Sequence, residues 1–348
     1  MYVEKSITVE IDTTGSVFAT RTVEEIVRLI DFFYKRCRAF LSDYRDKNGE
    51  LIFEGRFNLG AVSLNLPMIY MKARKEKLDY YETLNYYLEL IRKLHIKRFE
   101  YVGKAKANSN PLMFTQGGAY GGYLNPEDDI KPLLKSATIS FGITALHELC
   151  LIHNKKPISQ DNKIAIETME YINEYVERIK VEDNISYAIY GTPAESLIGV
   201  QLKQFRNKYG IIDGVSDKEF FTNSFHCYVG EDITPFEKQE KEEELFHMLK
   251  GGHIQYVRVN PNNKVALKKL ILRGLEKGFY QGVNFNECIC EDCGHNYTGE
   301  HGENCPKCNS SNITEYNRNC GYKGNSRVKG DTTFNPAKVK EIEVRVSM

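Results

Sequence analysis

Apolar residues recur along the chain at two spacings, which predict alternating helices and strands. From Tyr81 and again from Ala165, after an expected cap at Asp161, they return every three or four positions, as on one face of a helix. Runs rich in β-branched and aromatic residues predict five strands: Ala61–Leu66, Ala137–Phe141, Ser186–Tyr190, Phe220–Val229 and Ile254–Val259. This alternation favours an α/β fold with a largely parallel sheet and functional residues at strand ends and on loops.

The regular pattern changes at two places. It stops near Gln281, where a stretch rich in Cys, Gly and Asn begins. Residues 1–36 are also unusual, because a short strand-like run (SITVEI) precedes a helix-like one (VEEIVRLIDFFYKR). We therefore predict a separate N-terminal segment and a domain boundary between residues 280 and 281. The charged run Lys238–Glu244 (KQEKEEE) is interpreted as the solvated face of a helix.

Composition excludes several classes of protein. The 348 residues include 47 Lys and Arg against 47 Asp and Glu, and 41% are apolar, as in a soluble globular protein. A net charge of zero argues against a general nucleic-acid binder, which needs surplus positive charge to neutralise phosphates. The first residues do not resemble a secretory signal, and no apolar run approaches the roughly 20 residues of a membrane helix. We expect a cytoplasmic protein.

The cysteines predict a metal site. Five of the nine lie between Cys288 and Cys308, including two C-x-x-C pairs. Four thiolates on two tight turns form the tetrahedral set that Zn²⁺ prefers and leave no open position for catalysis. The expected ligands of this structural zinc are Cys290, Cys293, Cys305 and Cys308. Cys288 could replace Cys290, and His295 or His301 are weaker substitutes.

A short segment after this zinc ribbon, Arg318–Gly324 (RNCGYKG), resembles the radical-bearing loop of glycyl radical enzymes. A glycine α-carbon can carry a radical because two flanking peptide groups delocalise it and no side chain twists it out of plane. Further stretches, in the same order along the chain, resemble anaerobic (class III) ribonucleoside-triphosphate reductases. They are Cys37–Leu41 (CRAFL), Arg56–Pro67 (RFNLGAVSLNLP), Tyr190–Ser196 (YGTPAES), Phe221–His226 (FTNSFH) and the closing Phe334-Asn335.

The resemblance implies the second half of a ten-stranded α/β barrel, followed by a zinc ribbon and a glycyl radical loop. Residues 37–280 would form the catalytic half-barrel with the thiyl cysteine loop, and residues 281–348 the zinc ribbon and glycyl radical domain. The chain lacks the family's N-terminal regulatory module, the first half of its barrel and its second pocket cysteine. Residues 1–36 match no family segment, and Asn319 replaces a usually apolar residue. We therefore expect part of a split enzyme, with the first half on another chain, or a truncated remnant.

The resemblance also implies roles for particular residues. Gly321 would store the radical, and Cys37 would become the thiyl that takes the 3′-hydrogen of a ribonucleotide. Glu195 would act as the base at the 3′-hydroxyl, and Asn58 would donate hydrogen bonds to the ribose hydroxyls. Tyr190 is a candidate lining residue for the reductant, which is formate in much of the family. A separate radical-SAM activase would generate the radical with S-adenosylmethionine, and the assembled enzyme is expected to be a homodimer that supplies deoxyribonucleotides for DNA replication.

Other hypotheses remain at this stage. A zinc-ribbon protein could bind nucleic acid or another protein without chemistry, although the zero net charge and the set of Cys37, Glu195 and Gly321 argue against it. The chain could be an inactive remnant or an assembly subunit. It could also be another glycyl radical enzyme, which the zinc ribbon and FNLGAVSLNLP argue against.

Overall fold

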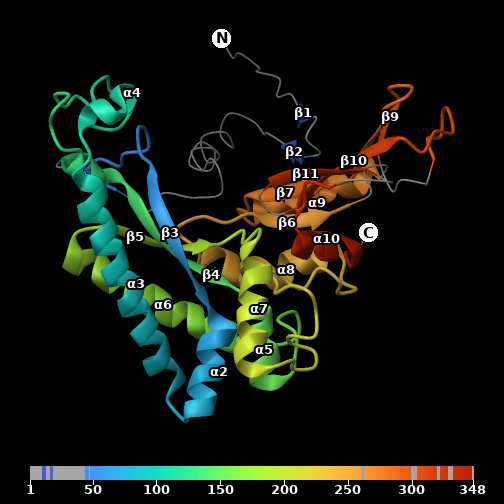
Figure 1. The fold of residues 1–348 in the computed structure, drawn as a ribbon, viewed down its shortest axis with the longest axis horizontal. Helices are drawn as coiled ribbons and strands as arrows, with labels where there is room; N and C mark the ends of the chain where they lie inside the picture. Colours follow the sequence, from blue (N-terminus) through green and yellow to red (C-terminus); the bar gives the residue numbers. More distant parts are fainter. Residues whose placement is uncertain are drawn as a thin grey trace.

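A computed structural model describes residues 10–12, 16–18, 44–46, 48–259, 263–298, 304–319, 322–327 and 332–346 (Figure 1). The strands are β1 (Glu10–Asp12), β2 (Ser16–Phe18), β3 (Asn58–Asn65), β4 (Thr138–Thr144), β5 (Ser186–Gly191), β6 (Gln255–Arg258), β7 (Gln281–Asn284), β8 (Glu287–Cys290), β9 (Asn296–Thr298), β10 (Ile313–Asn319) and β11 (Tyr322–Arg327). The helices are α2 (Leu66–Glu76), α3 (Tyr80–Gly103), α4 (Pro111–Phe114), α5 (Leu146–Asn154), α6 (Lys163–Asp183), α7 (Leu197–Tyr209), α8 (Pro235–His247), α9 (Lys264–Glu276) and α10 (Pro336–Glu343), with short 3₁₀ turns at Ala107–Ser109 and Lys131–Ser136.

These strands form three sheets. The first is parallel, in the order β3-β4-β5. The second has the order β1-β2-β7-β6, with β6 and β7 parallel, and the third is the antiparallel sheet β11-β10-β8-β9. The expected mixed α/β architecture is confirmed. The ten-stranded barrel stays a prediction, because the strands that the structure describes belong to three separate sheets.

The two faces of the β3-β4-β5 sheet differ in chemistry. One face carries buried apolar side chains from all three strands, such as Leu64, Phe141 and Ile189, and helices α3 and α6 pack against it (Figure 1). Neighbours in a strand point to opposite faces, so the other face carries small or polar residues, including Ser63 and Ser140. A half-polar sheet face is suited to hold a ligand rather than a second apolar layer.

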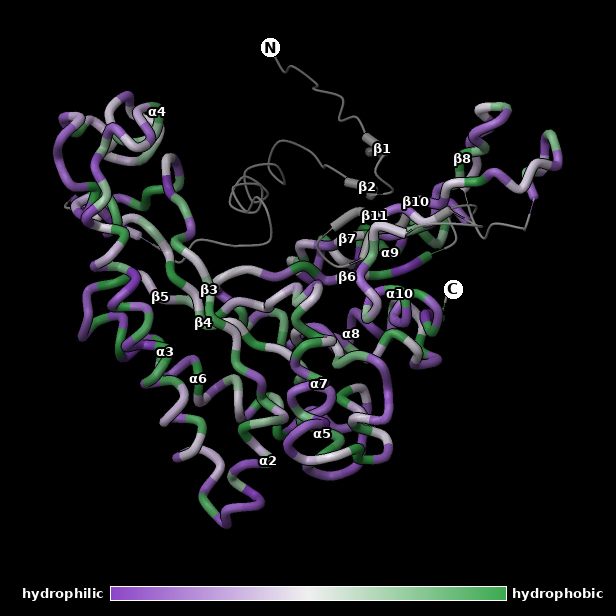
Figure 2. The backbone as a smooth tube through the Cα atoms, viewed as in Figure 1, coloured by the Kyte–Doolittle hydropathy of each residue, from purple (hydrophilic) through white to green (hydrophobic). Residues whose placement is uncertain are grey.

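Helices α3 and α6 follow the expected periodicity, and Figure 2 shows hydrophobic and hydrophilic segments alternating along both. The Asp79 side chain caps α3 by accepting a hydrogen bond from the Glu82 amide. The expected cap at Asp161 was wrong by one residue, since Asn162 is the N-cap of α6. Asp161 instead accepts a hydrogen bond from the Lys163 amide at 3.2 Å, just outside the helix.

Residues 220–229 correct a second expectation, because they form an irregular loop and not a strand. The Thr222 amide and hydroxyl both donate to the buried Glu148 carboxylate, at 2.9 and 2.8 Å. The Thr222 carbonyl accepts the Ala145 amide, and the Ser224 carbonyl accepts the Leu146 amide, each at 3.2 Å. The Glu148 side chain and the amides at the start of α5 thus bond the backbone groups that would pair with a neighbouring strand if this segment were in a sheet. The other four strand predictions are confirmed with small shifts in their bounds.

The charged run Lys238–Glu244 lies in α8 as expected, but its interpretation as a wholly solvated face was wrong. Gln239 and Glu242 are fully buried. The Gln239 side-chain amide donates to the Leu270 carbonyl on α9 at 3.0 Å. The hydrophilic sequence of this run therefore gave no indication that two of its side chains are buried. None of the described helices is both long and apolar enough to cross a membrane.

Two leucines of α3 provide a matched test of the core. Leu84 is fully buried, whereas Leu90 is 43% exposed on the outer side of the same helix. We expect Leu84→Ala to lower the free energy of unfolding by about 2–5 kcal/mol through lost contacts and a residual cavity. Leu90→Ala should change it by less than about 0.5 kcal/mol. Urea unfolding of both variants measures the difference, and equal effects would contradict the described packing of α3.

Candidate functional site

The four expected metal ligands come together in the third sheet. The Sγ atoms of Cys290, Cys293, Cys305 and Cys308 all lie within 4.8 Å of one another. The Cys290 and Cys308 sulfurs are 3.5 Å apart, and the Cys293 and Cys305 sulfurs are 3.8 Å apart. Ligands bound at about 2.3 Å to a tetrahedral zinc have sulfurs about 3.8 Å apart, so the donor set fits this metal.

Each C-x-x-C pair lies on a tight turn, and the residue just after each pair has a left-handed backbone conformation. Gly294 has a φ of +67°, and its amide donates to the Cys290 carbonyl at 2.9 Å. Asn309 has a φ of +58° and makes the equivalent bond to Cys305, also at 2.9 Å. Glycine and asparagine adopt this conformation at low cost. The two turns therefore direct two pairs of thiols at one point.

The alternative ligands are not part of this group. Cys288 is fully buried two residues before Cys290, and burial raises the pKa of its thiol to about 12. Burial would also raise the pKa of Cys305, but amide donors from Cys308 and Lys307 hold it at about 7. Cys305 is thus predisposed to the thiolate form that binds metal. Neither Cys288 nor His295 belongs to the described four-sulfur group, and His301 lies outside the described residues.

Asn58 begins β3 and lies on the small, polar face of the parallel sheet. Its side-chain amide donates to the Ser140 hydroxyl of β4 at 3.2 Å. Its carbonyl oxygen accepts the Gly60 amide at 2.7 Å, across an irregularity where the β3–β4 register shifts. Gly60 has a φ of +129°, which only glycine adopts readily. The local bend therefore fixes the Asn58 amide.

Tyr190 lies on the same face, near the opposite end of the sheet. It pairs with Gly142 of β4, which pairs in turn with Ser63 of β3. A Cβ at Gly142 would lie 2.3 Å from both the Ser63 and Thr192 hydroxyl oxygens, which are 2.7 Å from each other. Gly142 thus leaves room for a pair of hydroxyl groups in the middle of the polar face.

Glu195 lies in the turn between β5 and α7 and is partly buried. Ala194 before it has a φ of +49°, an unfavourable conformation that the packed turn maintains. The Glu195 carbonyl oxygen accepts a hydrogen bond from the Asn335 side chain at 3.3 Å. Without the family resemblance this residue would be interpreted as a first-turn helix glutamate, yet it precedes the Ser196 N-cap of α7.

The structure brings only part of the predicted catalytic set together. Tyr190 lies near the carboxyl end of β5, and Glu195 lies in the turn just after that strand. Asn58 instead pairs with Thr138, at the amino end of β4. Thr138 and Gly142 are four residues apart, or about 13 Å along a strand. Cys37 and Gly321 lie outside the described residues, and the paired residues Asn319 and Tyr322 are the described positions nearest to Gly321.

Helix α10 joins segments that are distant in sequence. Lys338 and Glu341 are buried, and the Lys338 ammonium contacts the Glu341 carboxylate at 2.5 Å and the Asn223 carbonyl oxygen at 3.3 Å. Arg345 donates to the same carboxylate at 3.1 Å. Burial would raise the pKa of Glu341, but the two cations hold it below its usual value. The C-terminal helix is thereby fixed to the FTNSFH loop.

The glycine that closes the RNCGYKG segment has a packing role. Gly324 lies in β11 against the Phe334 ring, and a Cβ there would lie 2.6 Å from that ring. Phe334 is buried, and Asn335 after it caps α10 by accepting a hydrogen bond from the Lys338 amide at 3.1 Å. The two closing motifs thus pack together.

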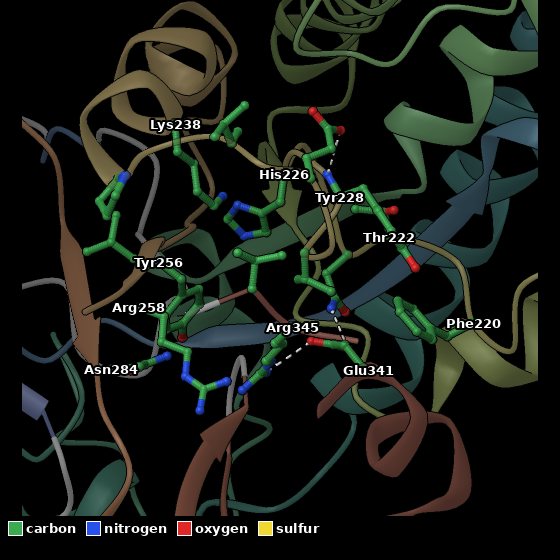
Figure 3. A pocket seen from close by; sticks show the side chains of 17 residues that line it. Phe220, Thr222, His226, Tyr228, Lys238, Tyr256, Arg258, Asn284, Glu341 and Arg345 are labelled. Atoms are coloured by element: carbon green, nitrogen blue, oxygen red, sulfur yellow. Dashed lines mark hydrogen bonds and ion pairs between the residues drawn. The ribbon is translucent and has the colours of Figure 1, made fainter. Parts of the chain in front are cut away.

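Sequence reasoning assigned no role to several charged residues around one cavity (Figure 3). His226 of the FTNSFH loop lines it together with Arg258 and Arg345. Glu242 lies behind His226 and accepts a hydrogen bond from the His226 Nδ1 at 3.2 Å. The FTNSFH motif was a signal for His226. Nothing in KQEKEEE distinguished Glu242, because its burial depends on elements packed against α8.

Comparison with known proteins gives a consistent result. The family model described as anaerobic ribonucleoside-triphosphate reductase matches residues 8–347. The anaerobic ribonucleoside-triphosphate reductase of Enterobacteria phage T4 is 35% identical over 324 residues, covering 89% of this chain and 52% of that protein. The Escherichia coli K12 protein of the same name is 31% identical over 327 residues, covering 89% of this chain and 45% of the relative. The chain therefore spans about half the length of these relatives.

Solved structures agree at the level of the fold. A structure titled anaerobic ribonucleotide reductase matches with a TM-score of 0.63 and 18% identity, over 83% of this chain and 44% of that one. An anaerobic ribonucleotide reductase from Thermotoga maritima gives a TM-score of 0.60 at 18% identity, over 86% of this chain and 51% of that chain. From the match across residues 8–347, this chain belongs to the anaerobic ribonucleoside-triphosphate reductase family.

Proposed function

We propose that this chain carries the radical chemistry of an anaerobic reductase that converts ribonucleoside triphosphates to deoxyribonucleoside triphosphates. The observation that carries the proposal is the family match across residues 8–347, which includes every segment assigned to the relay. The polar face of the β3-β4-β5 sheet supports it, because Asn58 and Tyr190 both lie there. We keep the expected division into residues 1–36, 37–280 and 281–348, although the family match begins at residue 8 and so includes most of the segment that we expected to match no part of the family.

In the proposed relay, the radical stored on Gly321 passes to the Cys37 sulfur. The Cys37 thiyl takes the 3′-hydrogen of the ribose, so that an S–H bond forms, a C–H bond breaks and the radical moves to C3′. These two bonds have similar strengths, which makes the step reversible. Cysteine is the side chain suited to this exchange.

The pocket residues act after hydrogen abstraction. Glu195 takes the proton of the 3′-hydroxyl while Asn58 donates hydrogen bonds to the ribose hydroxyls, and the 2′-hydroxyl leaves as water. Formate, bound near Tyr190, supplies two electrons as it is oxidised to CO₂. The Cys37 thiol then returns its hydrogen atom to C3′ and becomes a thiyl again. Overall, one ribonucleotide, one formate and one proton give one deoxyribonucleotide, CO₂ and water.

The four-cysteine group would hold a structural Zn²⁺, which supplies cross-linking and no open position for substrate. Cys290 ends β8 and pairs with Ile313, the first residue of β10. Strand β10 continues to Asn319, which pairs with Tyr322 at the start of β11. The metal would therefore anchor the strands that flank Gly321.

Partners are part of this proposal. Because the sequence spans about half of its relatives, the active enzyme would also need the first half of the barrel, which this sequence does not include. Strand β3 has only β4 as a partner among the described strands, and such an edge can pair with further strands. A radical-SAM activase would use S-adenosylmethionine to form the Gly321 radical, and two assembled enzymes would form a homodimer.

Cys305 and Cys288 offer a matched test of the metal site. Purified protein should contain one zinc per chain by metal analysis. Cys305→Ser should lose most of it, because three thiolates remain. Cys288→Ser, a change two residues from Cys290 and outside the four-sulfur group, should keep it. Absence of zinc from the native protein, or equal loss in both variants, would contradict the assignment.

Cys37 can be tested by turnover. Cys37→Ser, assayed with the N-terminal partner and activase, should reduce no nucleotide, since an O–H bond is too strong for the relay. Its zinc content and circular dichroism spectrum should not change. Cys150→Ala is the control, because Cys150 is buried in α5 and has no proposed role in catalysis. Substantial turnover by Cys37→Ser would refute the mechanism.

Gly321 can be tested without substrate. Anaerobic incubation with the activase, S-adenosylmethionine and a reductant should produce an organic radical with an EPR doublet from the one remaining α-hydrogen. Gly321→Ala should give no doublet, whereas Gly324→Ala serves as a packing control that keeps the radical position. Air should then cleave the activated chain at residue 321 and release residues 322–348. A folded, zinc-containing sample with its partner that gives neither result would favour an inactive remnant or a zinc-ribbon interaction protein.

A further inference from the structure

The turn that carries Glu195 depends on contacts from other parts of the structure. Ala194, just before it, is buried and has a φ of +49°, a conformation that residues other than glycine keep only when their surroundings hold them there. The Ala194 carbonyl accepts a hydrogen bond from the Ile198 amide at 3.1 Å, at the start of α7. The position of Glu195 therefore depends on the groups that pack against this turn.

One of these groups is Asn335, which comes from the C-terminal segment. Its Nδ2 donates to the Glu195 carbonyl oxygen at 3.3 Å, and its Oδ1 accepts a hydrogen bond from the Lys338 amide at 3.1 Å. The first bond joins residues that are 140 positions apart in the sequence. An amide side chain has both donors and an acceptor, so Asn335 caps α10 and holds the Glu195 turn at the same time.

Helix α10 is closely packed in its first turn, next to Asn335. Ala337 packs against the apolar cluster that includes Ala194 and Ile198. A Cβ at Gly199 of α7 would lie 2.8 Å from the Ala337 Cβ, so a larger residue at that position would push the two helices apart. This close packing restricts where Asn335 can lie relative to the Glu195 turn.

A short path of direct contacts leads from Asn335 back to β11, the strand that begins just after Gly321. The Thr333 amide donates to the Asn325 carbonyl oxygen of β11 at 2.9 Å, and the Thr333 hydroxyl accepts a hydrogen bond from the Asn325 amide, also at 2.9 Å. Because Thr333 and Asn335 are two residues apart, one short segment joins β11 to the Glu195 turn.

We propose that Asn335 is a positioning residue for the reaction. This inference rests on the proposed function, in which Glu195 takes the proton of the 3′-hydroxyl. The Asn335 amide fixes the backbone of Glu195, while Asn335 itself makes and breaks no covalent bond. A general base acts only within hydrogen-bond distance of the proton that it takes, so a small shift of this turn slows the step. The base thus depends on the position of the segment that follows Gly321.

Two substitutions separate this role from the capping of α10. Asn335→Ser and Asn335→Asp both keep an oxygen that can cap the helix, but both lack the Nδ2 donor. With the missing half of the barrel and the activase present, we expect kcat to fall by about three- to tenfold in Asn335→Ser. It should fall by about tenfold or more in Asn335→Asp, because a carboxylate oxygen would then face the Glu195 carbonyl. KM for the ribonucleotide should change by less than about twofold.

The matched control is Asn263→Asp. Asn263 is the N-cap of α9, accepts a hydrogen bond from the Ala266 amide at 3.0 Å and is exposed. The same substitution at the same helix position, outside the proposed site, should leave kcat unchanged. All these variants should keep the native zinc content, circular dichroism spectrum and EPR doublet, because Gly321 and the four cysteines are untouched.

A second readout identifies the step that is affected. With tritium at C3′ of the substrate, hydrogen abstraction moves the tritium to the Cys37 sulfur, where a thiol hydrogen can exchange with water before a hydrogen returns to C3′. Slower proton removal after abstraction allows more rounds of this exchange. The tritium released per deoxyribonucleotide formed should therefore rise in both Asn335→Asp and Glu195→Gln. A variant that only lowered the amount of folded enzyme would not change this ratio.

Native kcat in Asn335→Asp, or a lowered kcat with the native tritium ratio, would overturn the proposal. Loss of the EPR doublet would also overturn it, because Asn335 would then maintain the fold of the Gly321 segment and not the base. Glu195→Gln distinguishes these results from a failure of the proposed function. Native turnover by Glu195→Gln would show that the base is wrongly assigned, and the positioning role would fall with it. A slow Glu195→Gln beside a native Asn335→Asp would refute the positioning role alone.

Discussion

The parallel pairing of β3, β4 and β5 is the constraint on which the proposed active site depends. It places the apolar side chains of three strands on one face, under α3 and α6, and the small and polar ones on the other. A shift of one residue would exchange the faces and bury Asn58 and Tyr190 in the apolar core. The irregularity between Asn58 and Gly60 adjusts the register locally and leaves the rest of the sheet unchanged. Apolar packing on one face of the sheet thus fixes the strand register, and the register places the polar side chains of the opposite face.

The described residues before and after Gly321 are each attached to other parts of the structure. Before it, the four-sulfur group and the β8–β10 pairing hold the start of β10. After it, Phe334 packs on Gly324, and α10 binds the FTNSFH loop through Lys338 and Glu341. The proposed radical relay would require Gly321 to return to one position in every cycle, and anchored flanking residues suit that requirement. Asn335 extends this attachment to the Glu195 turn.

The buried carboxylates Glu242 and Glu341 each pair with a lysine of their own helix, and their further hydrogen bonds reach neighbouring elements. Glu242 connects α8 to the FTNSFH loop and β6, and Glu341 connects α10 to the same loop. Burial would raise the pKa of Glu242, but Lys238 and His226 hold it at about 2. Such pairs add little stability relative to apolar contacts, yet a misplaced element would leave a buried charge unpaired. They define how the C-terminal helix sits against the FTNSFH loop.

The amino-acid sequence by itself determined the features that depend on local spacing. Two C-x-x-C turns specify four converging thiols, and three-to-four-residue periodicity specifies α3 and α6, because both follow from a few neighbouring residues. It could not determine the loop at Phe220–Val229, whose β-like residues are held by Glu148 from another helix. Nor could the sequence identify Glu242 as buried. A glutamate in a charged run is expected to be exposed, and only the packing of β6 and the FTNSFH loop against α8 buries it. The family resemblance indicated Asn58, Tyr190 and Glu195, but their distribution along the sheet was decided by strand register. Contacts between distant segments depend on how whole elements pack, and only the tertiary structure contains that information.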